Sequence, residues 1–66
     1  ANINKNVLLE EMNLYADYLN PSGLLLLSGF YVDDIPDLLQ EASKYQLNEL
    51  KRDELENWAA LVLVKS

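Results

Sequence analysis

The chain has 66 residues, half of them hydrophobic, and its eleven acidic and five basic side chains give a formal net charge of −6. A chain this short forms at most one small domain and buries only about 60% of the surface that its unfolded form exposes. Because it has no cysteine or histidine, disulfides, the usual zinc sites and catalysis by either residue are excluded, and its acidity disfavours direct binding to nucleic acid or anionic membrane.

The first periodic segment, residues 6–19, predicts an amphipathic helix. Its apolar positions recur at the spacing of one helical face, and they are Leu8, Met12, Tyr15, Ala16 and Leu19. Asn4 or Asn6 is the candidate N-cap, and Pro21 prevents the helix from continuing. In the turn of residues 20–23, the proline presets its own φ and the glycine is expected to supply a positive φ.

A short apolar run, residues 24–30, follows this turn. Its length and its flanking glycines favour a strand, and its leucines suit a strand that is buried on both faces, as in a parallel sheet. A second helix is expected from about Ile35 to Tyr45, with Asp34 as its candidate N-cap and Pro36 tolerated in its first turn. The residues that mark its buried face are Ile35, Leu38, Leu39, Ala42 and Tyr45.

The last third of the chain has two interpretations. One is a helix, because Leu47, Leu50, Leu55, Trp58, Leu61 and Val62 have helical spacing. The other is a β-hairpin, because residues 58–64 form an apolar, β-branched run that suits a central strand. Secondary-structure propensity supports a three-helix protein and a protein with a β-hairpin nearly equally. In either case Trp58 is expected in the core, since large aromatic residues in apolar runs are usually buried.

Four segments together resemble the C-terminal half of the S-adenosylmethionine-dependent enzymes that methylate ribosomal protein L11. They are Ala1-Asn2-Ile3, residues 21–29 with their Pro-Ser-Gly turn and closing Ser-Gly, the acidic helix start at residues 33–36, and residues 57–63 with their Trp-Ala-Ala-Leu-Val-Leu. The resemblance covers essentially the whole chain. Residues 1–66 are therefore expected to form a C-terminal fragment of such a catalytic domain.

The resemblance implies an α/β fold, the C-terminal half of a Rossmann-like class I methyltransferase sheet. The chain would begin at the end of strand four, pass through a helix, strand five and a second helix, and end with strands six and seven as an antiparallel pair. This favours the hairpin, with its turn within residues 53–57 and strand seven between strands five and six. The polar residues Asn48, Glu49, Lys51 and Arg52 would then lie on an edge strand.

The resemblance makes Asn2 the candidate catalytic and substrate-binding residue, since it occupies the family's Ala-Asn-Ile motif. Its amide oxygen would orient the amine that attacks the cofactor's methyl group. Without the resemblance, Asn2 reads as a cap or turn residue. Ser28 and Gly29 end a strand at the sheet edge where open α/β sheets bind ligands, so they are candidate substrate-binding residues together with Phe30 and Tyr31. An ordinary strand-ending turn with aromatic core packing is the equal alternative.

The implied function is a protein methyltransferase whose cofactor is S-adenosylmethionine and whose partner is a ribosomal protein. The family's glycine-rich cofactor loop and ribose-binding acidic residue have no counterpart here, so the chain alone is expected to be inactive and to bind no cofactor. The acidic residues Glu10, Glu11, Asp33, Asp34 and Asp37 are expected on solvated faces and at caps. The alternatives are a class I methyltransferase for another substrate and a non-catalytic acidic interaction module.

Two further expectations concern assembly and location. If the resemblance holds, the strand of residues 24–30 lacks a neighbour on one side, and the chain should form homo-oligomers through that exposed sheet edge. The longest apolar run, residues 24–27, is too short to cross a bilayer, and no signal-peptide pattern is present. A cytoplasmic protein is therefore expected.

Overall fold

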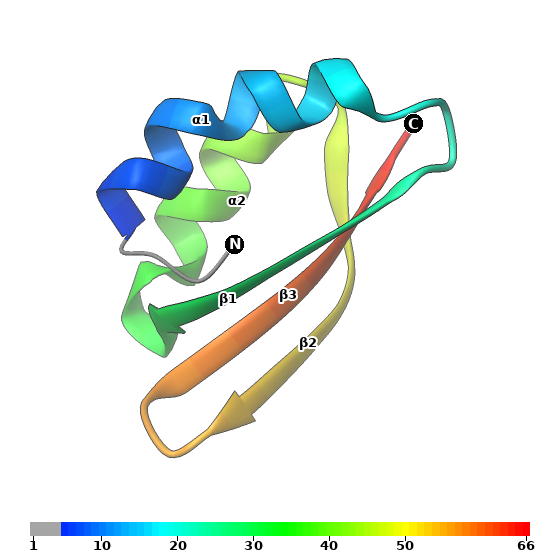
Figure 1. Ribbon diagram of the computed structural model, residues 1–66. Helices are drawn as coiled ribbons and strands as arrows, with labels where there is room; N and C mark the ends of the chain where they lie inside the picture. Colours follow the sequence, from blue (N-terminus) through cyan, green and yellow to red (C-terminus); the bar gives the residue numbers. More distant parts are fainter. Residues whose placement is uncertain (1–4) are drawn as a thin grey trace.

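The computed structural model describes residues 5–66, in which two helices lie against one face of a three-stranded sheet (Figure 1). Along the chain the elements are α1 (Lys5–Tyr18), β1 (Leu24–Tyr31), the 3-10 turn η1 (Val32–Asp34), α2 (Ile35–Ser43), β2 (Leu47–Leu55) and β3 (Trp58–Lys65). The fold is thus a small α/β arrangement. We call the sheet face that the helices cover the core face and the opposite one the open face.

Helix α1 has the amphipathic character that its spacing predicts. Leu8, Met12 and Ala16 are buried, and Tyr15 and Leu19 pack against them as partly buried residues. The helix ends at Tyr18, shortly before the proline. The predicted cap Asn6 is wrong, because this residue lies inside the helix, and the other candidate, Asn4, lies outside the described residues.

The turn after α1 differs from its prediction in one respect. Its backbone closes as expected, because the N–H of Gly23 donates to the carbonyl oxygen of Asn20 at 2.8 Å. The residue with a positive φ is Ser22, at 70°. Gly23 is required for a different reason, since a Cβ at this position would lie 2.8 Å from the Asn20 oxygen.

The sheet has the order β1-β3-β2, and β3 pairs antiparallel with both neighbours. The last third of the chain is therefore a hairpin, with Glu56 and Asn57 as its two-residue turn, and the three-helix interpretation is wrong. The central position of β3 confirms the arrangement that the resemblance implies for the last three strands. Strand β2 lies at an edge, and all of its residues except Leu47 are exposed, as its polar composition predicts.

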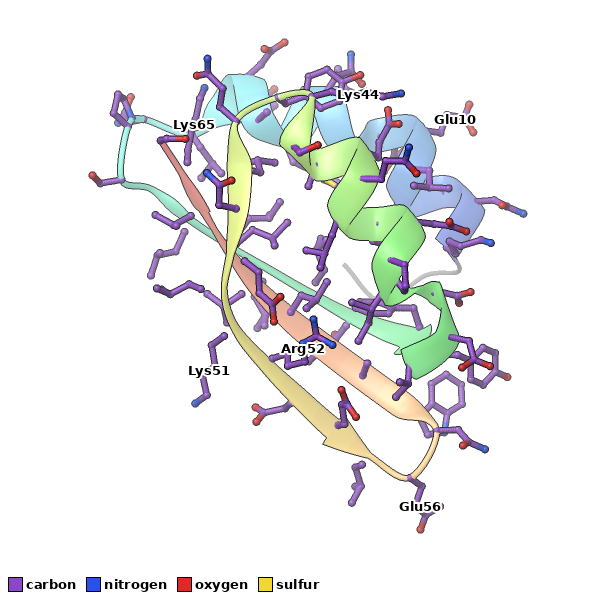
Figure 2. All side chains as sticks on the ribbon, turned by 180° about the vertical axis from the view of Figure 1, so that it is seen from behind. Glu10, Lys44, Lys51, Arg52, Glu56 and Lys65 are labelled. Carbon is purple, nitrogen blue, oxygen red and sulfur yellow. The ribbon has the colours of Figure 1, made fainter. Side chains whose placement is uncertain are left out.

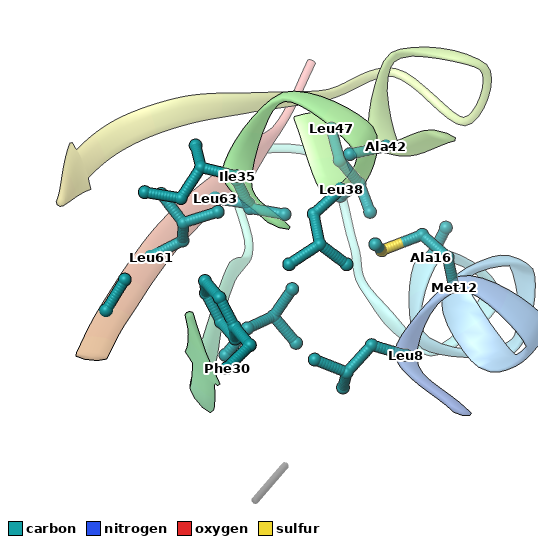
Figure 3. Packing of buried hydrophobic residues seen from close by; sticks show 12 residues of the cluster. Leu8, Met12, Ala16, Phe30, Ile35, Leu38, Ala42, Leu47, Leu61 and Leu63 are labelled. Carbon is teal, nitrogen blue, oxygen red and sulfur yellow. The ribbon is translucent and has the colours of Figure 1, made fainter. Parts of the chain in front are cut away.

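The core lies between the helices and the core face of the sheet (Figure 3). Its buried residues come from every helix and strand, and they are Leu8, Met12, Ala16, Leu27, Phe30, Ile35, Leu38, Ala42, Leu47, Ala59, Leu61 and Leu63. On α2 the predicted face is correct, although the helix ends at Ser43 and Tyr45 lies in the turn beyond it. Asp34 occupies the N-cap position without a capping hydrogen bond. Its carboxylate accepts the N–H of Tyr31 at 3.4 Å instead.

Two predictions about burial are wrong for residues on the open face. Strand β1 is not buried on both faces, because Leu24 and Leu26 are each 59% exposed on the open face. Trp58 is not a core residue, since it is 51% exposed. Both corrections have one cause: alternate residues of a strand point to opposite faces, and within residues 5–66 both helices cover the same face (Figure 1).

Candidate functional site

The end of β1 is shaped by a β-bulge at Gly29. Ser28 pairs with Ala60 and Phe30 pairs with Ala59, so Gly29 is the extra residue of this strand. Its φ is 85°, in the left-handed region where a side chain is strained. The bulge resets the alternation of the strand, because Phe30 is 1% exposed in the core while Tyr31 is exposed beside Trp58.

The structure separates the predicted site residues. Ser28, Gly29 and Tyr31 lie at the same end of the open face, whereas Phe30 packs in the core. Asn2 lies outside the described residues, so its position relative to the others stays a prediction. The substrate-binding role assigned to all five residues likewise stays a prediction.

Ser28 and Gly29 line a hollow of about 680 Å³ at this end of the sheet. All of its lining residues come from the three strands, and they are Ser28, Gly29, Asp53, Glu54, Leu55, Trp58, Ala59 and Ala60. Its volume falls in the range of small-molecule pockets. Asp53, Leu55 and Trp58 are not predictable from the sequence as members of this site, because only the strand register brings them beside Ser28.

A stacked aromatic pair borders the hollow. The ring centroids of Tyr31 and Trp58 lie 4.6 Å apart with an interplanar angle of 24°, a geometry in which the two rings stabilise each other. The adjacent hairpin turn is held by the N–H of Val32, which donates to the carbonyl oxygen of Asn57 at 2.9 Å. The aromatic pair therefore lies next to a hydrogen-bonded turn at the end of the sheet.

Near the hollow, strand β2 carries a bidentate ion pair between Arg52 and Glu49. Arg52 donates to both carboxylate oxygens of Glu49, at 2.6 and 2.9 Å, and this hydrogen bonding lowers the pKa of Glu49 below its ordinary value. Arg52 also lies 3.5 Å from Glu54. Figure 2 shows Arg52 pointing toward the helices and Lys51 pointing away from them, in agreement with the strand register. Arg52 thus neutralises carboxylates on the core side and leaves Lys51 on the open face.

Two features are absent from the described residues, namely a cluster of possible metal ligands and a helix that could span a membrane. Within residues 5–66 no group of three or more acidic side chains could hold a metal ion. No helix in that part of the chain is long and apolar enough to cross a membrane. The residues that line the hollow combine an aromatic ring, apolar side chains and two carboxylates.

Comparison with known proteins gives several relatives that share one name. No protein-family model matches the chain. A curated relative named ribosomal protein L11 methyltransferase from Bacteroides fragilis is 44% identical over 64 residues, covering 97% of this chain and 23% of the relative. The protein of the same name from Porphyromonas gingivalis is 48% identical over 61 residues, covering 92% and 21%. That from Phocaeicola vulgatus is 36% identical over 64 residues, covering 97% and 23%.

The chain spans less than a quarter of the length of the curated relatives that it matches. The match with the Bacteroides fragilis relative nevertheless covers 97% of the chain. Over almost its whole length, the chain is therefore homologous to one segment of ribosomal protein L11 methyltransferase.

Proposed function

We propose that the chain is the C-terminal part of the catalytic domain of an S-adenosylmethionine-dependent methyltransferase that modifies amino groups of ribosomal protein L11. The observation that carries this proposal is the 44–48% identity to proteins of that name across at least 92% of the chain. The strand order β1-β3-β2 supports it, because strands five, seven and six of such a sheet would have this order. The relatives' name favours ribosomal protein L11 over another substrate and over a non-catalytic module.

In this proposal Asn2 is the residue closest to the chemistry. Methyl transfer to an amine requires a neutral nitrogen lone pair aimed at the methyl group, and a side-chain amide oxygen can orient that nitrogen. S-adenosylmethionine supplies the methyl group when it is bound. Ser28, Gly29 and Tyr31 would contribute to the surface beside the substrate, and Phe30 would support that surface from the core.

The described residues do not fit a complete cofactor site. The chain has two glycines. Gly23 closes the turn onto Asn20, and Gly29 forms the bulge inside β1, so neither lies in a loop between a strand and a helix N-terminus of the kind that cradles a cofactor. We therefore propose that the 66-residue chain alone neither binds S-adenosylmethionine nor transfers methyl groups.

The test uses the full-length protein that contains this chain, with purified ribosomal protein L11 and cofactor labelled in its methyl group. We expect label on the ribosomal protein, and Asn2→Ala should raise the barrier to transfer by about 2–4 kcal/mol, as loss of one positioned hydrogen-bonding group does elsewhere. Cofactor affinity should change little, because the residue acts mainly at the transition state.

Asn13→Ala is the matched control, because Asn13 is an exposed asparagine of α1, and it should retain full activity. Absence of transfer to the ribosomal protein by the unaltered enzyme would overturn the proposed function. An unchanged rate for Asn2→Ala at saturating substrate would leave the function intact and make Asn2 a structural residue.

A further inference from the structure

Lys5 joins the starts of the two helices. It is the first described residue of α1, and its Nζ atom lies 3.2 Å from the Oδ2 atom of Asp37 and 3.8 Å from the Oδ1 atom of Asp34. Asp37 belongs to the first turn of α2, and Asp34 is the N-cap residue of that helix. One ammonium group of α1 therefore bridges two carboxylates at the start of the other helix.

The same cluster of charges reaches the end of β1. The other oxygen of the Asp34 carboxylate, Oδ2, accepts the N–H of Tyr31 at 3.4 Å, and Tyr31 is the last residue of β1. Figure 1 shows the start of α1, the start of α2 and the end of β1 at the same end of the molecule. Lys5 thus ties the first helix to the end of the strand that carries the proposed substrate-facing residues.

The local structure of α1 does not account for a lysine at this position. The N-terminal end of a helix carries a partial positive charge, so a cation in the first turn is unfavourable, and the first turn of α1 contains no acidic residue. Asp34 and Asp37 offset this unfavourable position of Lys5 from the neighbouring helix. The side chains of Lys5 and Asp34 are 31% and 21% exposed, so water screens their attraction only in part.

The position of Lys5 matters because Asn2 precedes it by three residues in the sequence. Three peptide units limit the distance between the two Cα atoms to about 11 Å. A shift in the start of α1 therefore moves the point to which the segment that carries Asn2 is attached. Methyl transfer depends steeply on alignment, since a displacement of about 1 Å can lower a rate by about two orders of magnitude.

We infer that Lys5 is a positioning residue for the proposed methyl transfer. Its ion pairs with Asp34 and Asp37 hold the start of α1 against the end of β1, and this attachment aligns Asn2 with the amine of the substrate. The inference rests on the proposed function and adds to it a residue that touches neither substrate nor cofactor. A partly exposed ion pair contributes little to the stability of a fold, so its loss should lower the rate of transfer without unfolding the enzyme.

The test uses the full-length protein that contains this chain, with purified ribosomal protein L11 and cofactor labelled in its methyl group. Lys5→Met removes the charge, and we expect it to lower kcat about three- to tenfold with little change in KM or in cofactor affinity. Lys5→Arg should retain most of the rate, because a guanidinium group can bridge the same two carboxylates. Lys44→Met is the matched control, since it removes an ion pair with Glu41, and it should retain full activity. Circular dichroism of each variant checks that the fold is retained.

A double-mutant cycle with Asn2→Ala separates positioning from a general structural role. If Lys5 acts through Asn2, Lys5→Met should lower kcat little or not at all when residue 2 is already alanine. An equal loss of kcat in both backgrounds would overturn the inference, and so would an unchanged kcat for Lys5→Met alone, while the proposed function would stand in either case. Absence of transfer by the unaltered enzyme would instead overturn the proposed function, and the inference with it.

Discussion

The Nζ atom of Lys65 lies 2.6 Å from the carbonyl oxygen of Ala16 and also donates to that of Leu19, at 3.1 Å. The side chain at the end of β3 therefore caps the C-terminal end of α1, where free carbonyl groups and the negative end of the helix dipole favour a cation. The backbone of Lys65 is fixed as well, because its N–H donates to Gly23 and its carbonyl oxygen accepts the N–H of Ser22. One residue thus joins the first helix, its following turn and the last strand.

Replacing Lys65 by methionine keeps the methylene stem and removes the capping charge. We expect this change to lower the free energy of unfolding by about 1–2 kcal/mol, since two carbonyl groups lose a charged donor. Lys51→Met is the control, because Lys51 forms no side-chain hydrogen bond or ion pair within residues 5–66. Urea denaturation at low protein concentration measures both variants, and equal stability of the two would show that the cap contributes nothing.

Replacing Ser22 by glycine should stabilise the chain. Ser22 has a φ of 70°, where a side chain is strained and glycine is not. We expect a gain of about 0.5–1 kcal/mol, partly offset by the greater freedom of glycine in the unfolded chain. Gly23→Ala should do the reverse, because its Cβ would lie 2.8 Å from the Asn20 carbonyl oxygen. Thermal unfolding followed by circular dichroism compares the two, and a stabilising effect of Gly23→Ala would contradict the turn geometry.

The pKa of Glu49 should depend on Arg52. Hydrogen bonds from Arg52 lower the pKa of Glu49, so the stability that this pair contributes is present above the unfolded-state pKa and is lost as pH falls through the folded-state value. In the Arg52→Gln variant the pKa of Glu49 should rise toward its ordinary value. Carbon-13 NMR of the Glu49 carboxyl group during an acid titration measures the change, and an identical titration curve in both proteins would rule out the interaction in solution.

The chain should self-associate through β1. Within residues 5–66 this strand pairs with β3 on one side only, and Leu24 and Leu26 are each 59% exposed, so an unpaired strand edge lies beside an apolar surface. Leu26→Lys should weaken the association, whereas Leu50→Lys should not, because Leu50 is 60% exposed on the other edge strand. Sedimentation equilibrium from micromolar to millimolar concentration is the measurement. A folded chain that stays monomeric throughout this range would contradict the prediction.

Local periodicity predicts the helices well, because the apolar residues of their buried faces recur at helical spacing in the sequence. Leu8, Met12 and Ala16 are buried where the helical spacing of α1 puts them. The hairpin was a different case, since the charged residues of β2 have good helix propensity and become a strand only by pairing with β3. Choosing the hairpin required the family resemblance.

The candidate site was predictable only in part, because it depends on strand register. Ser28 was identified from its place at the end of a strand, whereas Asp53 reaches the same hollow because both residues lie opposite Ala60. Trp58 was assigned to the core because an apolar run does not reveal which sheet face remains uncovered. Phe30 and Tyr31 were grouped together, and the bulge at Gly29 sends one to the core and leaves the other exposed.

The central strand of the sheet, β3, comes after both of its neighbours in the sequence. Because β1 and β2 each pair with β3 and not with each other, this part of the sheet cannot assemble on the ribosome until residues 58–65 have left the exit tunnel. During this interval the leucines of β1 are available to chaperones. A premature stop before Trp58 would consequently remove the strand that joins β1 to β2.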